Sequence, residues 1–259
     1  MTDSPRKPIR VPADELVVLR GLAVSRAQAQ ALIMAGEVMS GDRRVEKPGV
    51  KMAEGAPLSL ISRARFVSRG GEKLDHAIVA FTPLGLQIQG KSCLDVGAST
   101  GGFTDCLLQR GAARVVAVDV GYGQLAQKLR DDPRVDSRER VNARDLNRDD
   151  LSPPPELVVV DASFIGIGKL MGAIARLLPA GGELVALVKP QFEAGREAVS
   201  KGRGVIRDPE IRSAAIAGAR CDIEAAGFTV VGDVDSAVPG PKGNVEHFVY
   251  ARRTAEPGP

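Results

Sequence analysis

The feature that most constrains the fold is an apolar segment that passes directly into a glycine-rich turn. Residues 93–96 have strand character, small residues follow from Gly97 to Gly102, and a helix is expected from about residue 102. A second apolar segment, residues 114–118, ends in Asp119. In open α/β sheets small residues let the backbone close on a ligand, and an acid at the next strand tip binds ribose hydroxyls. The two segments therefore predict an α/β sheet with a site for an adenosine ribose.

The form of this turn favours one class of adenosine ligand. The GxGxxG pattern of dinucleotide-binding proteins is absent, and the turn reads Asp-Val-Gly-x-x-x-Gly-Gly from Asp95 to Gly102. This form fits a sulfonium-bearing adenosine better than a pyrophosphate. A tight turn that binds no ligand is the alternative that the turn alone leaves open.

Helix and strand signals alternate from residue 70 to the end of the chain. Helices are expected over residues 71–82, 102–110 and 209–226, and strands over 92–96, 114–119, 156–160, 183–188, 229–234 and 246–251. This rhythm predicts a Rossmann-like, doubly wound sheet with a mostly parallel core. The last two strands are close in sequence, which indicates an antiparallel hairpin at one edge.

Residues 1–62 have a different organisation. Helices are expected over 13–21 and 26–35, the second opened by a capping box of Ser25 and Gln28, and residues 37–60 alternate short strands with turns. This pattern predicts a small α+β domain near the lower size limit for independent folding. Residues 1–10 are expected to form a flexible basic tail, 63–69 an interdomain linker, and 70–259 the second domain.

The positive charge of the chain is concentrated near its start. The net charge is +3, and residues 1–75 hold 13 of the 35 lysines and arginines but only 9 of the 32 acidic residues. A basic excess of this kind favours contact with a polyanion through the N-terminal part, although a solvated basic surface would give the same count.

Cysteine usage and hydropathy bear on the compartment. The scattered cysteines Cys93, Cys106 and Cys221 are expected to be buried thiols in a reducing environment, and the two histidines lack metal-ligand spacing. No apolar run approaches the roughly 18–20 residues of a membrane span, and the first ten residues have no signal-peptide core. We therefore expect a cytoplasmic monomer with no membrane partner and no bound metal.

Ionisable residues occur where the predicted strands end or begin. Asp161 and Lys189 each follow an apolar strand, Glu246 begins the last strand, and Lys73 lies on the helix before the first strand. Ligands gather at the carboxyl ends of such strands, and a charge there is costly unless it is paired or used. We expect the four residues to converge and to tune one another's ionisation. Separate surface ion pairs are the alternative for each residue taken alone.

If the cofactor is S-adenosylmethionine, the residues after the strands limit the methyl acceptor. Enzymes that methylate a base amino group usually carry the motif Asp/Asn-Pro-Pro-Tyr/Phe at this position, where this chain has Asp161 followed by Ala-Ser-Phe. Methylation of cytosine carbon 5 needs a cysteine nucleophile, and Cys93 and Cys106 are misplaced for it. A hydroxyl such as the ribose 2′-hydroxyl is left, and a desolvated lysine can accept its proton.

Together these motifs resemble the TlyA family, ribosomal RNA 2′-O-methyltransferases that are sometimes named haemolysins. The resemblance covers residues 11–253 and is carried by residues 68–74, 94–104, 119–125, 161–165, 188–193 and 243–246. It implies an FtsJ-like methyltransferase sheet. Residues 22–26 and 32–38 resemble the αL RNA-binding domain, which would make the small N-terminal domain an RNA-binding one.

The resemblance implies methyl transfer from S-adenosylmethionine to a cytidine ribose of ribosomal RNA. Lys189 would be the proton acceptor or its electrostatic helper, Asp161 would orient it, and Lys73 and Glu246 would position the ribose. The cofactor contacts would be Gly97, Ala98, Ser99, Thr100, Gly101, Gly102, Phe103, Asp119, Asn142 and Asp161. The RNA contacts would be Arg20, Arg26, Lys47, Arg65 and Arg69.

The resemblance also bears on coupling and on substrate. Residues 65–67 match the family's interdomain segment, which is thought to couple RNA docking to cofactor binding. Little sequence follows the last strand, which favours the shorter class of the family, acting on the large subunit alone. A haemolysin-like pore former, a non-catalytic RNA-binding assembly factor, and an enzyme acting on another RNA such as transfer RNA are the rival hypotheses.

Overall fold

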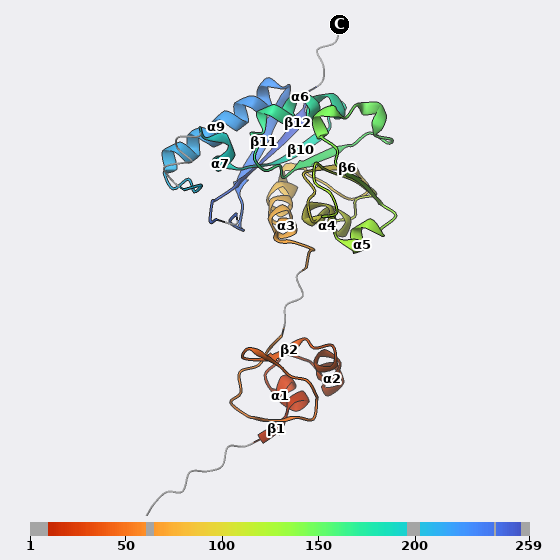
Figure 1. Cartoon of the computed structure of the whole chain (residues 1–259), viewed down its shortest axis with the longest axis vertical. Coiled ribbons are helices and arrows are strands. Elements are labelled where there is room, and N and C mark those ends of the chain that lie inside the picture. Colours follow the sequence, from red (N-terminus) through yellow and green to blue (C-terminus); the bar gives the residue numbers. More distant parts are fainter. Residues whose placement is uncertain (1–9, 61–64, 196–202, 241, 255–259) are drawn as a thin grey trace, which may run out of the picture. The chain divides into compact units, whose positions relative to one another are not determined.

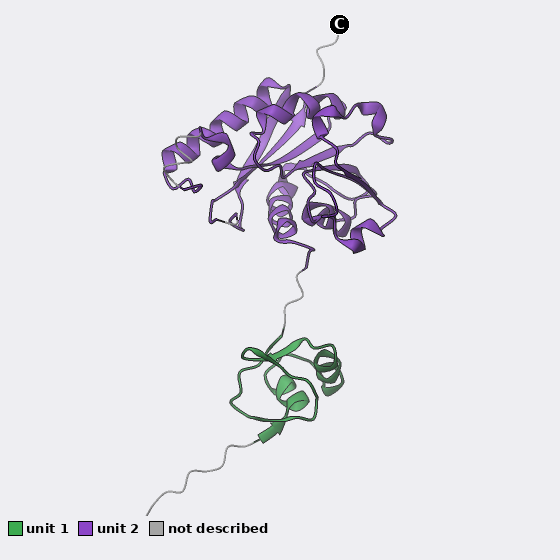
Figure 2. Ribbon diagram, in the orientation of Figure 1, with its two compact units in different colours: residues 1–64 green, residues 65–259 purple. Residues whose placement is uncertain are grey.

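The computed structural model describes residues 10–60, 65–195, 203–240 and 242–254 (Figure 1). The chain divides into two compact units, Met1–Ala64 and Arg65–Pro259, each with its own core (Figure 2). Residues 1–9 of the expected tail and residues 63–64 of the expected linker lie outside the described residues. Arg10, which we expected in the tail, is instead the first residue of a strand because it pairs with Ala53.

The N-terminal unit is a small α+β fold. Its helices are α1 (Ala13–Leu19) and α2 (Arg26–Met34), and its strands are β1 (Arg10–Pro12), β2 (Val38–Ser40), β3 (Arg43–Arg44), β4 (Lys51–Ala53) and β5 (Ser59–Leu60). β1 pairs with β4, and β2 lies between β3 and β5. Val17, Ala29, Ile33 and Val38 are buried in one small cluster, which joins the helices to the strands.

The start of α2 shows the expected cap with one change. The Ser25 side chain accepts a hydrogen bond from the backbone N–H of Gln28. The Gln28 side chain, however, accepts from the N–H of Val24 at 2.8 Å, one residue earlier than a capping box requires. Both exposed donors are still satisfied, so the helix begins where the sequence predicts.

The second unit is built on a seven-stranded sheet. Its strands are β6 (Ser92–Val96), β7 (Arg114–Asp119), β8 (Val135–Glu139), β9 (Leu157–Val160), β10 (Glu183–Val188), β11 (Phe228–Asp235) and β12 (His247–Arg253). The order is β11-β12-β10-β9-β6-β7-β8, and only the pairs made by β12 are antiparallel. The mostly parallel sheet and the antiparallel edge hairpin are confirmed. Strand β8 was not predicted, because its residues are mostly polar.

Alternate residues of the central strands face two helical layers (Figure 1). One face packs against α6 (Gly168–Leu177) and α9 (Pro209–Ala225), and the other against α3 (Arg69–Phe81) and α4 (Gly102–Gln109). The shorter elements are α5 (Gln127–Arg130), α7 (Pro190–Glu193) and the 3-10 turns η1 (Thr82–Leu84), η2 (Ala143–Asp145) and η3 (Arg148–Asp150). Burial on both faces explains why the central strands read as continuous apolar runs.

The cysteines differ in part from expectation. Cys93 and Cys106 are buried, and burial raises the pKa of each thiol to about 12. Cys221 is exposed, so its predicted burial was wrong: α9 lies on the outside of the sheet and turns this position to solvent. Among the described residues, no helix has both the length and the apolar character to cross a membrane.

The direction of β12 determines what gathers at one edge of the sheet. β6, β7, β9 and β10 run parallel, so their carboxyl ends share that edge. β12 runs the opposite way, and its first residue, His247, pairs with Val188 at the end of β10. Glu246, just before β12, is thereby brought beside Lys189, just after β10.

Candidate active site

The glycine turn after β6 brings two strand ends into close approach. Gly97 has a φ of +86°, and a Cβ at this position would lie 2.7 Å from the carbonyl oxygen of Asp161. A larger residue would therefore need both a strained backbone and a wider gap between β6 and β9. The glycine therefore lets the turn lie directly against the residue after β9, and Gly97 lines both cavities described below.

The helix after the turn is packed as closely. A Cβ on Gly102 would lie 2.3 Å from Ser68 Oγ and 2.8 Å from the backbone nitrogen of Gly71, so the starts of α3 and α4 touch. Gly101 also has positive φ. A Cβ at this position would point at Leu129, and Gly101 lines neither cavity described below. Its predicted contact with the cofactor stays a prediction.

One cavity at this edge has the character of an adenosine site. It has a volume of about 510 Å³ and is lined by Gly97, Ser99, Asp119, Asn142 and Asp161 together with apolar residues of β7 and α6. Asp119 accepts hydrogen bonds from the backbone N–H groups of Ser99 (2.8 Å) and Gly121 (2.7 Å). A carboxylate has lone pairs beyond these two, so Asp119 can still bind ribose hydroxyls. These residues fit S-adenosylmethionine.

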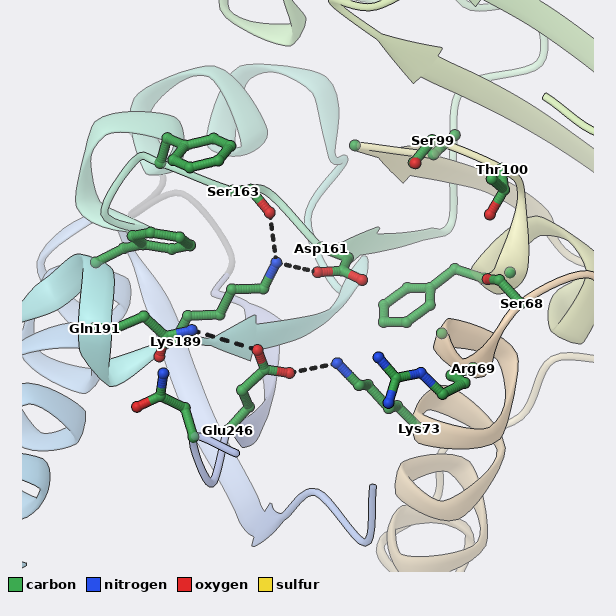
Figure 3. A pocket seen from close by; sticks show the side chains of 18 of the residues that line it. Ser68, Arg69, Lys73, Ser99, Thr100, Asp161, Ser163, Lys189, Gln191 and Glu246 are labelled. Carbon is green, nitrogen blue, oxygen red and sulfur yellow. Dashed lines mark hydrogen bonds and ion pairs between the residues drawn. The ribbon is translucent and has the colours of Figure 1, made fainter. Parts of the chain in front are cut away.

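A second cavity adjoins the first and contains the four predicted catalytic residues. Its volume is about 570 Å³, and Lys73, Asp161, Lys189 and Glu246 all line it (Figure 3). Ala98, Thr100, Gly102 and Phe103 line it from the glycine turn and α4. The two cavities share Gly97, Ser99 and Asp161 among their lining residues, so they are continuous at this point.

The first ion pair in this cavity joins the ends of β9 and β10. Lys189 Nζ lies 2.5 Å from Asp161 Oδ1 and donates a hydrogen bond of 2.9 Å to Ser163 Oγ (Figure 3). Lys189 is buried, whereas Asp161 is partly exposed toward the cavity. Sequence reasoning did not single out Ser163, because only the turn after β9 brings its hydroxyl to the ammonium group.

The second ion pair joins α3 to the residue before β12. Lys73 Nζ lies 2.5 Å from Glu246 Oε2, and both residues are buried (Figure 3). Gln191 Nε2 approaches the other Glu246 oxygen at 3.5 Å. Removing one member of a buried pair leaves an uncompensated charge, which costs about 3–5 kcal/mol. The four residues thus form two pairs within one cavity rather than a single cluster.

A further buried acid lies beneath the turn. Asp95 on β6 is fully buried, and its Oδ2 accepts a hydrogen bond of 2.7 Å from Thr104 Oγ1. Desolvation by burial raises the pKa of Asp95 to about 7, against the lowering effect of the Thr104 hydrogen bond and with a smaller increase from Asp161. Asp95 therefore changes its charge near neutral pH.

An aromatic surface stands beside Lys189. Phe164 has a φ of +66° and is 90 % exposed, and its ring centroid lies 5.3 Å from that of Phe192. Positive φ is strained for a residue with a side chain, and an exposed aromatic ring is unfavourable in water. Both phenylalanines line the second cavity, and their rings are tilted by 46° to each other, so each ring offers its own face for stacking a nucleobase.

The predicted RNA contacts of the N-terminal unit are all exposed, but two have internal partners. Arg26 pairs with Asp14 at 2.9 Å, and Arg20 donates to the carbonyl oxygen of Glu54 at 2.9 Å. A hydrogen bond from Gln30, with further help from Arg26, holds the pKa of Asp14 below its ordinary value. Lys47 has no ion-pair partner among the described residues of the chain.

The other two predicted RNA contacts belong to the second unit. Arg65 pairs with Asp75 at 2.5 Å and stacks over Phe66, with 4.7 Å from guanidinium carbon to ring centroid. Phe66 is buried, and the N–H of Val67 donates to Asp105 on α4 at 2.8 Å. Arg69 begins α3 and lines the second cavity. This segment is therefore fixed to α4, the helix that follows the glycine turn.

Comparison with known proteins identifies the family. Residues 66–253 match the FtsJ-like methyltransferase model, and residues 11–56 match the S4 domain. The chain is 44 % identical to the 16S/23S rRNA (cytidine-2′-O)-methyltransferase TlyA of Mycobacterium tuberculosis over 94 % of this chain and 90 % of that protein. The chain belongs to the TlyA family. It is thus a methyltransferase with an N-terminal RNA-binding S4 domain.

Other TlyA-family relatives carry different names. The 23S rRNA (cytidine-2′-O)-methyltransferase TlyA of Campylobacter jejuni is 35 % identical, over 78 % of this chain and 76 % of that protein. A solved structure with a hemolysin name, from Streptococcus thermophilus, aligns with a TM-score of 0.72 and 40 % identity, covering 96 % of this chain and 90 % of that one.

The fold extends beyond these relatives. An S-adenosylmethionine-dependent methyltransferase structure from Listeria monocytogenes aligns at a TM-score of 0.52 and 13 % identity, over 71 % of this chain and 99 % of that one. At that identity the likeness shows the fold alone.

Proposed function

We propose that this TlyA-family chain transfers the methyl group of S-adenosylmethionine to the ribose 2′-hydroxyl of a cytidine in ribosomal RNA. The observation that carries the proposal is the meeting of two ion pairs, Lys189–Asp161 and Lys73–Glu246, in a cavity that adjoins the adenosine site. The names of the relatives from M. tuberculosis and C. jejuni support the choice of acceptor.

The cofactor supplies an electrophilic methyl group on a sulfonium, and the side chains of this chain prepare the acceptor. The 2′-hydroxyl oxygen gains the methyl group and loses its proton, and Lys189 Nζ, when it is the neutral amine, is placed to receive that proton. Asp161, at 2.5 Å, and Ser163, at 2.9 Å, fix the direction of the amino group. Lys73 and Glu246 hold the opposite wall, where they can position the ribose.

The buried location of these pairs also serves the reaction. Water that entered the cavity would screen the charges that orient the hydroxyl. The exposed Phe164 and its neighbour Phe192 can cover the mouth of the cavity by stacking on the target base. An RNA in which the target nucleotide is unpaired should therefore be preferred.

The test is transfer of labelled methyl from S-adenosylmethionine to separated ribosomal subunits and to transfer RNA. We expect label on ribosomal RNA, with loss of at least about 100-fold in rate for Lys189→Ala and unchanged cofactor binding. Label on transfer RNA alone would show a different substrate. No label on any RNA, despite measured cofactor binding, would refute the proposal.

The same assay addresses the finer part of the proposal, that the large subunit alone is modified. Label on the large subunit and none on the small one is the expected result. Label on both subunits would retain the reaction and overturn the restriction. Cell lysis by the purified chain that survives Lys189→Ala would instead favour the haemolysin-like hypothesis.

A further inference from the structure

The cavity of the proposed reaction holds more positive than negative charge. Its charged lining residues are the cations Arg69, Lys73, Lys189 and Lys242 and the carboxylates Asp161 and Glu246. Lys73 is paired with Glu246 and Lys189 with Asp161. Across the part of the chain that the structure describes, neither Arg69 nor Lys242 has an ion-pair or hydrogen-bond partner.

These two cations are supported by different elements. Arg69 is the first residue of α3, on the same helix as Lys73 (Figure 3). Lys242 lies in the loop between β11 and β12, four residues before Glu246 in sequence. Each residue of the Lys73–Glu246 pair therefore has an unpaired cation four residues before it in the sequence.

Residues on both sides of Lys242 form backbone hydrogen bonds. The Gly240 N–H donates to the carbonyl of Asn244 at 2.9 Å, and the Gly243 N–H donates to Gly240 at 2.8 Å. Asn244 is buried and bonds the neighbouring loop twice, accepting from Ile206 N–H at 2.9 Å and donating to the Gly204 carbonyl at 2.9 Å. These two hydrogen bonds join the loop that carries Lys242 to residues 204–206, a second wall of the cavity to which Gly204 contributes.

The Lys242 side chain lies along this second wall. A Cβ on Gly204 would lie 3.3 Å from Lys242 Nζ. The ammonium group therefore lies against a glycine, where no side chain occupies the space beside it. An exposed, unpaired ammonium group held over a cavity is suited to an anion that enters from outside. S-adenosylmethionine carries a sulfonium and an ammonium group against one carboxylate, so it does not balance the excess.

We propose that Lys242 is a substrate-positioning residue that binds a backbone phosphate next to the target ribose. The proposal rests on the function proposed above and names the part of the RNA that is held. A phosphodiester is the anion that an RNA acceptor necessarily brings to this cavity. Its contact with Lys242 would fix the 2′-hydroxyl between Lys189 and Glu246.

The test compares full-length wild type with Lys242→Gln, Lys242→Arg and the control Lys169→Gln. Lys169 is also exposed and, among the described residues, unpaired, and it lies on α6 outside this cavity. Binding of a single-stranded, cytidine-containing RNA oligonucleotide is measured over a series of salt concentrations, S-adenosylmethionine affinity by calorimetry, and methyl transfer with isolated large subunits.

We expect Lys242→Gln to weaken RNA binding on the order of tenfold and to lower the magnitude of the salt slope by about 0.7–0.9. Cofactor affinity should be unchanged, KM for the subunits should rise, and Lys242→Arg should restore both the affinity and the slope. Lys169→Gln should resemble wild type.

Several results would overturn the proposal. Weaker cofactor binding with an unchanged salt slope would assign Lys242 to the carboxylate of S-adenosylmethionine. Equal effects of Lys242→Gln and Lys169→Gln would show that RNA binding responds to the overall positive charge of the protein rather than to a contact with Lys242. If wild type transferred no methyl group to any RNA, the proposed function would fail, whereas the salt slopes would still report on Lys242.

Discussion

At the scale of single residues, the site depends on charges that are balanced in two pairs and on the Ser163 hydroxyl, which contacts Lys189 of the first pair. Lys189 is buried and touches Asp161 and Ser163, while Lys73 and Glu246 are buried against each other. The contribution of such groups to the reaction rate depends on their orientation, because a misplaced proton acceptor loses much of its effect.

Ser163→Ala tests this direction. The change leaves Lys189 with Asp161 alone, so the amino group is free to take other orientations. We expect kcat to fall by about 5- to 10-fold, with little change in the KM for RNA or in cofactor affinity. Ser163→Thr keeps the hydroxyl and should retain most of the rate. A rise in the KM for RNA without a fall in kcat would instead mean that Ser163 contacts substrate.

Asp95→Asn tests the buried acid. The pKa of Asp95 is about 7 in the folded protein, above the value of about 3.9 in an unfolded chain. The folded state therefore holds the proton more tightly, and this group's contribution to stability is lost as pH rises from about 4 to about 7. Asparagine does not ionise, so the variant does not lose this contribution. The free energy of unfolding of Asp95→Asn minus that of wild type should therefore be larger at about pH 8 than at about pH 5, by on the order of 2 kcal/mol.

Urea unfolding at the two pH values measures this difference. Thr104→Val, which removes the donor to Asp95 but not the acid, serves as the comparison. A difference between Asp95→Asn and wild type that does not change with pH would contradict the raised pKa.

At the scale of elements, close approach of backbones fixes the cofactor turn. The start of α4 lies against the start of α3 because Gly102 has no side chain, and the β6 turn lies against the residue after β9 for the same reason at Gly97. The segment 65–68 enters this contact through Phe66 and Val67. The turn, the two helices and the segment before α3 are therefore packed together as one unit.

A matched pair of glycine substitutions tests this contact. Gly102→Ala would place a Cβ 2.3 Å from Ser68 Oγ, so we expect a loss of about 1–3 kcal/mol in stability and weaker binding of S-adenosylmethionine. Gly172→Ala, on α6, meets no atom within 4 Å and should be neutral or stabilising by up to about 1 kcal/mol. Thermal unfolding and calorimetry measure both, and equal behaviour of the two variants would refute the explanation.

At the scale of the whole molecule, the chain consists of two units with separate cores. The core of the N-terminal unit comprises residues of that unit alone, and it is small, as expected for a unit near the lower size limit. We therefore expect that a change in the core of the N-terminal unit can weaken RNA binding without weakening cofactor binding.

Ile33→Ala tests this independence. Ile33 is buried on α2, and its truncation should cost about 2–4 kcal/mol, a large part of what so small a unit can supply. We expect weaker RNA binding with unchanged affinity for S-adenosylmethionine, measured by RNA binding and calorimetry. The neighbouring Met34, 73 % exposed, gives the control Met34→Ala, which should resemble wild type. Loss of cofactor affinity in Ile33→Ala would show that the units are energetically coupled.

The sequence by itself determined the elements whose signals are local. Apolar runs identified β6, β7, β9 and β10, because strands buried on both faces are made mostly of apolar side chains. The glycine turn and the cap at Ser25 were also readable, because they satisfy backbone constraints of neighbouring residues. The polar edge strand β8 and the exposure of Cys221 were not, because both depend on which neighbour covers them.

Only the tertiary structure decided how the charged residues pair. The sequence placed Asp161, Lys189 and Glu246 at strand ends and Lys73 on the helix before the first strand. Contact between positions 173 residues apart, as for Lys73 and Glu246, depends on the antiparallel direction of β12. The same direction places Lys242 on the cavity. Local sequence specifies which residues can carry a charge at a strand end, whereas the order and direction of the strands determine which charges meet.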